Sequence, residues 1–259
     1  MSDYLPKITI ATVTYNAGKV LERTINSVEM QSYPEIEHLI VDGNSQDNTL
    51  ELLHRYQERN SRALIRHEIS AISEPDKGLY DAMNKALSMA TGDYICFLNA
   101  GDKLHASDTI SKVVGAAGHK VGVIYGLTDI VDEEGVFLRP RRLTPPNRLT
   151  WRSFRHGMLI CHQAFFANIQ LARETPYDCR YRFSADFDWC IRIMKKSQTC
   201  RMSLNNSGAV VADYLEEGLT TRNHKASLHE RFRIMSRHYG WITTVAMHAW
   251  FIARTFLKK

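Results

Sequence analysis

Carboxylates stand at three places in the sequence where they could take part in chemistry. Asp102 ends the segment 97–102 (FLNAGD), Asp42 follows the run 37–41, and Asp186 and Asp188 lie in the segment SADFDW. Mg²⁺ and Mn²⁺ prefer oxygen ligands and are often held by few carboxylates together with substrate phosphates. Asp102 fits such a site, although a turn or a helix cap explains it equally well.

The other two positions have local explanations as well as chemical ones. Asp42 could accept hydrogen bonds from a nucleobase or ribose, or form an Asx-turn leading into Gly43, the simpler interpretation of this residue alone. Asp186 and Asp188 begin an expected helix, where acids commonly complement the helix dipole. The chemical alternative is a general base within hydrogen-bonding reach of an acceptor hydroxyl.

A polar run from residue 73 to residue 85 (SEPDKGLYDAMNK) is harder to explain by packing. It places acids, two lysines and an asparagine where an expected strand passes into an expected helix. The amino end of such a helix could face a phosphate. Asp76 is the candidate ligand-binding acid of this run.

Strands and helices alternate through the first hundred residues. Apolar, often β-branched runs predict strands, at residues 7–14, 37–41, 63–72 and 93–98. Helical periodicity fills the intervals, and Asn16 is expected to be the N-cap of the first helix. The alternation predicts an α/β fold with a mostly parallel, doubly wound sheet and helices on both faces. Ligands of such sheets bind at the carboxyl ends of the strands, which gathers Tyr15, Asp42, Asp76 and residues 99–102 around one crevice.

The second half of the chain is less regular. A hairpin is expected from residues 121–131 and 136–139, and helices at 185–196, 225–239 and 241–257. There is no internal repeat and no low-complexity linker. The simplest organisation is one domain over residues 1–221, with a nucleotide-binding half (1–102) and an acceptor half (103–221), followed by a basic helical extension over residues 222–259.

Positive charge is unevenly distributed. The chain has a net charge of +5, but residues 222–259 carry eight Lys and Arg against the single acid Glu230. The stretch 135–173 contains seven arginines and no acid. These stretches are either solvated basic faces or surfaces that meet a diphosphate, a lipid phosphate or a membrane.

Composition bounds the class of protein. Hydrophobic residues make up 44% of the 259-residue chain and charged residues 24%, as in ordinary globular proteins. Five cysteines without a CxxC pair argue for a reduced, cytoplasmic compartment and against a zinc or disulfide framework. No signal peptide is expected from residues 1–7, and no apolar stretch reaches the roughly 20 residues of a membrane span.

Five segments together resemble the inverting glycosyltransferase family 2, which has the GT-A fold, and most closely its capsule, O-antigen and colanic-acid branch. They are TVTYN (12–16), VDGNSQDNT (41–49), the run 73–85, residues 92–102 and SADFDW (184–189), in family order and with family spacing over roughly residues 7–215. One segment alone would be weak, whereas five in order are strong.

The resemblance implies a role for each candidate residue. Thr14, Tyr15, Asn16 and Asp42 would hold the nucleotide of a nucleotide-sugar donor, with Asp76 and Asn99 beside it. Asp102 would bind a divalent cation (Mn²⁺ or Mg²⁺) under the diphosphate, and Asp186 would be the catalytic base, with Asp188 supporting the helix. The acceptor would be a glycan, often linked to undecaprenyl diphosphate in similar enzymes, which implies the inner face of the cytoplasmic membrane.

The chain departs from the broad family in one place. Many members carry Asp-x-Asp-Asp after the fourth strand, where Asn99 and Gly101 stand here and only Asp102 remains. His162 and Gln163 resemble a further segment of the branch. A buried, hydrogen-bonded histidine in a strand is the simpler interpretation, and the alternative is that both residues border the acceptor or the diphosphate. The segment 218–221 (GLTT) resembles the loop that closes over the donor. Candidates on that loop are Thr220, Arg222 and His224.

The last expected helix is amphipathic. One half of its helical wheel is apolar, including Trp241, Val245 and Ile252, and the other half carries most of the polar residues. It could dock on the domain, form a dimer, or lie in an anionic membrane surface.

Other functions fit less well. A sugar nucleotidyltransferase would need a glycine-rich basic loop where residues 15–19 (YNAGK) stand, and no GxGxxG follows a strand as a nicotinamide enzyme would require. The basic stretches lack a nucleic-acid recognition motif. The alternative that stays open is a non-catalytic nucleotide-sugar-binding subunit or scaffold of a polysaccharide assembly complex.

Overall fold

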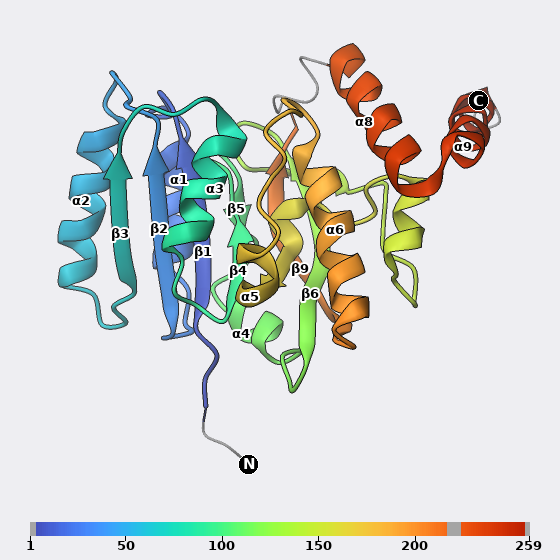
Figure 1. The fold of residues 1–259 in the computed structure, drawn as a ribbon. Helices are drawn as coiled ribbons and strands as arrows, with labels where there is room; N and C mark the ends of the chain where they lie inside the picture. Colours follow the sequence, from blue (N-terminus) through green and yellow to red (C-terminus); the bar gives the residue numbers. More distant parts are fainter. Residues whose placement is uncertain (1–3, 217–223, 257–259) are drawn as a thin grey trace.

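A single mixed sheet of nine strands forms the centre of the computed structural model, which describes residues 4–216 and 224–256 (Figure 1). The strand order is β3-β2-β1-β4-β8-β6-β9-β5, and β7 pairs with β6. Helices cover the sheet on both faces, so the predicted α/β fold is confirmed.

The amino-terminal half of the sheet is parallel. Its strands are β1 (Ile8–Thr14), β2 (Ile36–Asp42), β3 (Glu68–Ser73) and β4 (Tyr94–Phe97). Every residue of β1, β2 and β4 is buried, and the polar ones among them, such as Thr12, His38 and Asp42, are hydrogen-bonded. Because the strands run in register from Ile8↔Ile36 to Thr14↔Asp42, their carboxyl ends meet at one edge.

The second half mixes directions. Strand β8 (Phe165–Asn168) is antiparallel to both β4 and β6 (Val121–Val131), whereas β6 and β9 (Ser203–Leu215) are parallel. The short β5 (Lys103–Leu104) pairs with β9, and β7 (Phe137–Pro140) forms the expected hairpin with β6.

Helices connect these strands along the chain. The α-helices of the first half are α1 (Leu21–Glu29), α2 (Thr49–Ser61), α3 (Leu79–Met89) and α4 (Thr109–Val114). The second half contains the 3₁₀ helices η1 (Trp151–His156) and η2 (His162–Ala164), and the α-helices α5 (Ile169–Arg173), α6 (Ala185–Thr199), α8 (His224–Tyr239) and α9 (Trp241–Phe256). None of the described helices is long and apolar enough to cross a membrane.

The predicted N-cap at Asn16 is wrong. Helix α1 begins at Leu21, after Val20, and Asn16 adopts a left-handed conformation with φ 49°. Its side chain accepts a hydrogen bond from the Gln46 backbone amide (2.8 Å), and its own amide donates to Ser45 Oγ (2.8 Å). Asparagine tolerates this conformation because its short polar side chain can bond nearby backbone. Asn16 therefore ties the loop after β1 to the loop after β2.

A histidine buried between β2 and α2 stabilises the parallel half. The two ring nitrogens of His38 lie 3.0 Å from Thr12 Oγ1 and 3.0 Å from the Tyr56 hydroxyl. Burial, with a smaller contribution from His67, lowers the pKa of His38 from 6.5 to about 3. The folded protein therefore holds this imidazole neutral.

We expect the free energy of unfolding to fall as the pH drops from about 6.5 toward 3, because the unfolded chain binds a proton that folded His38 excludes. The slope from this one group is at most about 1.4 kcal/mol per pH unit. Urea unfolding of the wild type and His38→Gln across this range should show a shallower slope in the variant. The same change at the exposed His54 should leave the slope unchanged, and equal slopes for all three proteins would contradict the assignment.

Candidate active site

The buried carboxylate of Asp42 organises the carboxyl ends of β1, β2 and β3. It accepts hydrogen bonds from Thr14 Oγ1 (2.8 Å), from Ser73 Oγ (2.7 Å) and from both the amide and the hydroxyl of Ser45. Burial alone would raise the pKa of Asp42, but the hydrogen bonds from Ser45, Ser73 and Thr14 outweigh it and leave the pKa below its usual value. The bond to the Ser45 amide is the local turn expected for this residue, and three strand ends share the same acid.

Tyr15 and Asp76 lie beside this acid. The side chain of Tyr15 is 67% exposed. Gly43 separates the two residues: a methyl group placed on Gly43 would come within 2.5 Å of Asp76 Oδ2 and 3.4 Å of Tyr15 Cδ2. Thr14, Tyr15, Asp42 and Asp76 therefore lie close together, as the strand ends predicted for Tyr15, Asp42 and Asp76.

The amino end of α3 is already occupied by its own acids. The Gly78 amide donates to Asp76 Oδ1 (2.7 Å) and the Lys77 amide to Asp81 Oδ2 (3.0 Å). Lys85 binds Glu74 (2.7 Å) and the Pro75 carbonyl. The polar run is thus mainly internally bonded, and the suggestion that this helix end faces a phosphate gains no support.

Asp102 is buried at the start of the second half of the sheet. Its Oδ2 accepts from Gln163 Nε2 (2.6 Å) and its Oδ1 from the Leu215 amide (3.0 Å). Burial raises the pKa of Asp102 to about 6, although both hydrogen bonds act against the rise. Near neutral pH this carboxylate is mostly ionised, and it takes up a proton as the pH falls below about 6.

The oxygens around Asp102 suit a hard divalent cation. Among the described residues, Asn99 Oδ1 is buried and accepts no hydrogen bond, so it is a second oxygen in need of a partner on the same segment. A carboxylate and an amide oxygen are ligand types that Mg²⁺ and Mn²⁺ accept. The residues present therefore fit the expected cation.

A second cluster of possible metal ligands is formed by Asp213 of β9, Asp129 of β6 and His105, which follows β5. Ligand atoms of His105, Asp129 and Asp213 lie within 4.8 Å of one another, and sequence analysis did not single them out. Lys103 Nζ is 3.1 Å from Asp213 Oδ2 and His105 Nδ1 is 2.7 Å from Asp213 Oδ1. Basic side chains of the protein thus already bind Asp213, which makes this group a poorer cation site than Asp102.

His162 connects the Asn99 segment to Asp186. Its Nε2 lies 3.1 Å from Asn99 Nδ2, and its Nδ1 lies 3.2 Å from Asp186 Oδ2. The Tyr80 hydroxyl donates to Asp186 Oδ1 (3.3 Å). Burial acts to raise the pKa of Asp186, but His162, together with Arg231 and the Phe187 amide, outweighs it and lowers the pKa below its usual value. Asp186 is therefore an ionised acceptor that keeps 15% of its side chain exposed.

This position of His162 differs from the expected one. The residue belongs to the 3₁₀ helix η2, whereas β8 begins only at Phe165, so the expectation of a strand histidine was wrong. The turn carries both His162 toward Asp186 and Gln163 toward Asp102. The signal in the sequence was the His-Gln pair, which resembles a segment of the family branch. In the structure, each residue of the pair contacts one of the candidate acids.

Asp188 faces away from the site. It is fully buried, and its oxygens accept from Arg192 Nε (2.6 Å) and pair with His238 Nε2 (2.7 Å) on α8. These contacts agree with a structural role for Asp188, and they attach α6 to α8.

Helix α8 also holds the segment that leads into Asp186. Glu230 accepts hydrogen bonds from the backbone amides of Arg182 (2.8 Å) and Phe183 (2.9 Å), and the hydroxyls of Ser184 and Ser227 lie 2.9 Å apart. Sequence analysis treated residues 222–259 as an extension and missed this role. The available signal was Glu230 itself, the single acid of a strongly basic segment.

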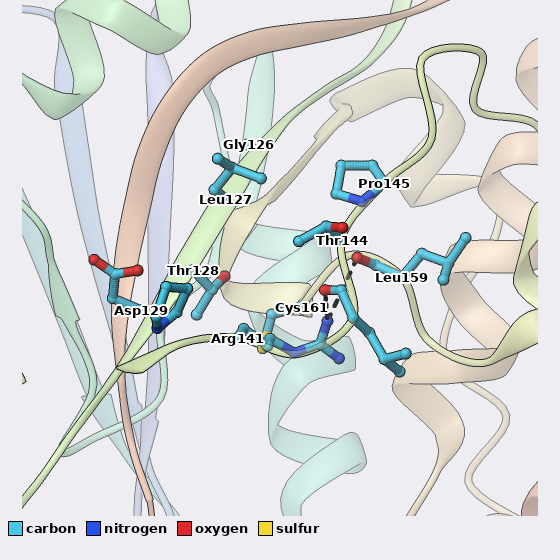
Figure 2. Close-up of a pocket in the computed structure, with 11 residues that line it drawn as sticks. Gly126, Leu127, Thr128, Asp129, Arg141, Thr144, Pro145, Leu159 and Cys161 are labelled. Atoms are coloured by element: carbon cyan, nitrogen blue, oxygen red, sulfur yellow. Dashed lines mark hydrogen bonds between the residues drawn. The ribbon is translucent and has the colours of Figure 1, made fainter. Parts of the chain in front are cut away.

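A small cavity of about 50 Å³ lies between β6 and the segment that follows β7 (Figure 2). The Arg141 guanidinium forms part of its wall and donates to the carbonyls of Leu143 and Leu159. Cys161, also in the wall, donates to Gln163 Oε1 (2.7 Å), and Gln163 in turn binds Asp102. Cys161 and Gln163 thus connect the cavity wall to Asp102.

Three candidate residues belong to the loop that was expected to close over the donor. Thr220 and Arg222 lie outside the described residues. His224 is the first residue of α8, and its side chain lies outside the described part of the chain. Their roles stay predictions.

Replacing Glu230 should loosen the segment before α6. We expect Glu230→Gln to raise the hydrogen-exchange rates of the Arg182 and Phe183 amides about 10- to 100-fold, because hydrogen bonds to a charged acceptor contribute roughly 1.5–3 kcal/mol. Amide exchange followed by NMR measures this. The matched change at the exposed Glu58 should leave both rates unaltered, and unchanged rates in Glu230→Gln would show that Glu230 does not hold the segment.

The chain is similar to known proteins over most of its length. The family model "Glycosyl transferase family 2" matches residues 9–174. A PGL/p-HBAD biosynthesis glycosyltransferase of Mycobacterium tuberculosis is 32% identical over 222 residues, covering 82% of this chain and 78% of the relative.

Two solved structures share the fold. Staphylococcus aureus TarS 1–349 in complex with UDP-GlcNAc matches with a TM-score of 0.69 and 17% identity, over 88% of this chain and 64% of that one. The mannosyltransferase PcManGT from Pyrobaculum calidifontis, in complex with GDP-Man and Mn²⁺, matches with a TM-score of 0.62 and 18% identity, over 97% of this chain and 76% of that one. The family match, the relative and the GT-A architecture agree: the chain belongs to glycosyltransferase family 2.

Proposed function

We propose that this enzyme transfers a sugar from a UDP- or GDP-sugar to a hydroxyl of a lipid-linked glycan, with inversion at the anomeric carbon and with a divalent cation. The observation that carries the proposal is the position of His162, within 3.2 Å of Asp186 and 3.1 Å of Asn99. One imidazole thus spans the distance between the proposed base and the proposed cation-binding segment. Donor and acceptor chemistry can meet there.

In this mechanism the acceptor hydroxyl attacks the anomeric carbon opposite the bond to the diphosphate. A C–O bond forms to the acceptor while the C–O bond to the phosphate breaks, and Asp186 takes the hydroxyl proton. A cation held by Asp102 and Asn99 would supply positive charge to the departing diphosphate. His162 and Tyr80 act as positioning residues, since each holds one oxygen of the Asp186 carboxylate.

At the other end of the crevice, Asp42, Tyr15 and Asp76 would bind the nucleoside. Two further observations support a nucleotide-sugar donor: TarS binds UDP-GlcNAc and PcManGT binds GDP-Man with Mn²⁺. Relatives named for PGL/p-HBAD biosynthesis and, provisionally, for teichuronic acid biosynthesis support a role in the biosynthesis of a glycosylated product. A cytoplasmic enzyme that works at the inner face of the membrane, in contact with it through residues 222–259, fits the proposed lipid-linked acceptor.

Asp186→Asn should lower kcat about 10²- to 10⁴-fold, the usual contribution of base catalysis, and leave nucleotide affinity unchanged. The amide is isosteric but accepts no proton. Sugar transfer from UDP- and GDP-sugars to lipid-linked acceptors measures kcat, and calorimetry measures nucleotide binding. Asp188→Asn is the matched change on the same helix. It should lower the stability of the protein but leave kcat and nucleotide affinity of the folded variant close to those of the wild type. Full turnover by Asp186→Asn would refute the assignment of the base.

Asp102→Asn should abolish the part of nucleotide binding that depends on metal. The measurement is calorimetric titration of UDP and GDP, each with Mn²⁺ and with EDTA. In the wild type, one of the two nucleotides should bind more weakly with EDTA than with Mn²⁺. In Asp102→Asn, its affinity should be the same under both conditions. Because the pKa of Asp102 is about 6 and a carboxylate binds metal only when deprotonated, metal affinity should weaken progressively as the pH falls below about 6. Asp129→Asn is the control for the second cluster. If metal dependence is lost in Asp129→Asn and kept in Asp102→Asn, the cation binds at His105, Asp129 and Asp213 and not at Asp102.

If neither nucleotide binds the folded wild type, the scaffold alternative replaces sugar transfer. The ionised, partly exposed Asp186 favours catalysis over that alternative.

A further inference from the structure

Helix α9 is packed with its polar side inward. Thr244 is buried, and the His248 ring lies between Phe232 and Phe251, with centroids 5.0 Å and 5.6 Å away. Met247 and Phe251 pack against the main core. The contacts of α9 with the rest of the protein therefore use the half of the helix that carries its polar residues.

The outward half of α9 is entirely apolar. Among the described side chains of this helix, residues 241–254, every exposed one is apolar: Trp241, Ile242, Val245, Ala246, Ala249, Trp250, Ile252 and Ala253. Trp241 is 66% exposed, Ile242 82% and Trp250 50%. A surface helix normally turns its apolar stripe to the core, and a contiguous exposed apolar face marks an interaction site. We call this half the outer face of α9.

The fold brings the two acid-free stretches of the sequence together beside this face. Helix η1, from the stretch 135–173, contacts both α8 and α9, and it is the yellow-green helix next to α9 in Figure 1. The rings of Trp151 and Tyr239 stack with centroids 5.6 Å apart, and the Tyr239 hydroxyl donates to the Trp151 carbonyl (2.7 Å). Residues 231–259 contain no acid either.

Exposed cations lie at this junction. Arg152 and Arg155 of η1 are exposed. Arg254 of α9 is partly exposed, and α9 contacts η1. Burial, and then the positive charges of Arg155 and Arg254, lower the pKa of the neighbouring His156. Lys258 and Lys259 follow α9 in the sequence. An apolar face is thus bordered by positive charge from two distant parts of the chain.

We propose that the outer face of α9 and the arginines of η1 dock together on an anionic phospholipid bilayer, with α9 lying in the plane of the headgroups. Tryptophans favour that depth, apolar helix faces insert there, and surface cations attract anionic lipids. The 16 residues of α9 extend about 24 Å and lie flat rather than span. A second copy of the chain fits this surface less well, because a symmetric contact would bring its cations against themselves.

This surface would hold the active site at the membrane, where the proposed function places a lipid-linked acceptor. The biological role of this docking rests on the proposed function. The docking itself is tested by vesicle binding, which needs no sugar transfer. Figure 1 shows α8 and α9 together at one end of the molecule, beside α6.

The test is flotation of the full chain with vesicles of phosphatidylcholine alone and of phosphatidylcholine mixed with phosphatidylglycerol. The wild type should bind the mixed vesicles, and added salt should weaken the binding. Trp241→Ser combined with Trp250→Ser should weaken it more than about ten-fold, since burial of each ring is lost. The matched control is Leu64→Ser, at a fully exposed residue after α2, which should bind as the wild type does.

Charge removal tests the second part of the surface. Arg152→Gln and Arg155→Gln should each weaken binding to the mixed vesicles about five-fold, and a spectrum and nucleotide affinity like those of the wild type would show that each variant is folded. The proposal is overturned if the wild type binds neither kind of vesicle, if the double tryptophan variant binds as the wild type does, or if that variant converts a wild-type dimer to a monomer. Vesicle binding by a chain that binds no nucleotide would leave the docking standing and remove the proposed function.

Discussion

A buried carboxylate must be compensated by hydrogen bonds or positive charge, because an ionised group in the interior otherwise costs several kcal/mol. This constraint explains how the site is assembled. Asp42 is compensated by residues from β1, the loop after β2 and the end of β3, Asp102 by η2 and the end of β9, and Asp186 by η2 and α3. Asp188 is compensated by its own helix and by α8. Each acid therefore joins segments that lie far apart in sequence, and the elements around the crevice are positioned by these bonds.

The parallel half of the fold could be predicted because its signals are local. Buried parallel strands are rich in apolar and β-branched residues, as in β1 and β2, and helices between them have regular periodicity, as in α3. The direction of a parallel sheet then places every strand end at one edge. From that direction alone, Tyr15, Asp42 and Asp76 are expected to lie together, and they do.

The remaining features depend on partners that the sequence does not identify. Asparagine is a residue type that often caps helices. Asn16 instead bonds Ser45 and the Gln46 amide, on a loop about thirty residues away, and these contacts hold it outside the helix. His162 and Gln163 have the pattern of a strand, yet their turn is fixed by the acids on either side. The polarity of α9 was visible in the sequence. Which half faces outward was not, since that depends on Phe232 and the core beneath it.

The contact between Glu230 and the segment before α6 has an evolutionary consequence. Glu230 binds backbone amides, not side chains, at positions 182 and 183. Every residue except proline presents such an amide, so these two positions are free to drift without losing the contact. Among descendants of a common ancestor, position 230 would then stay constant while its partners vary independently. Methods that detect spatial neighbours through correlated substitutions would find no trace of this link, although it secures the segment that leads to the proposed base.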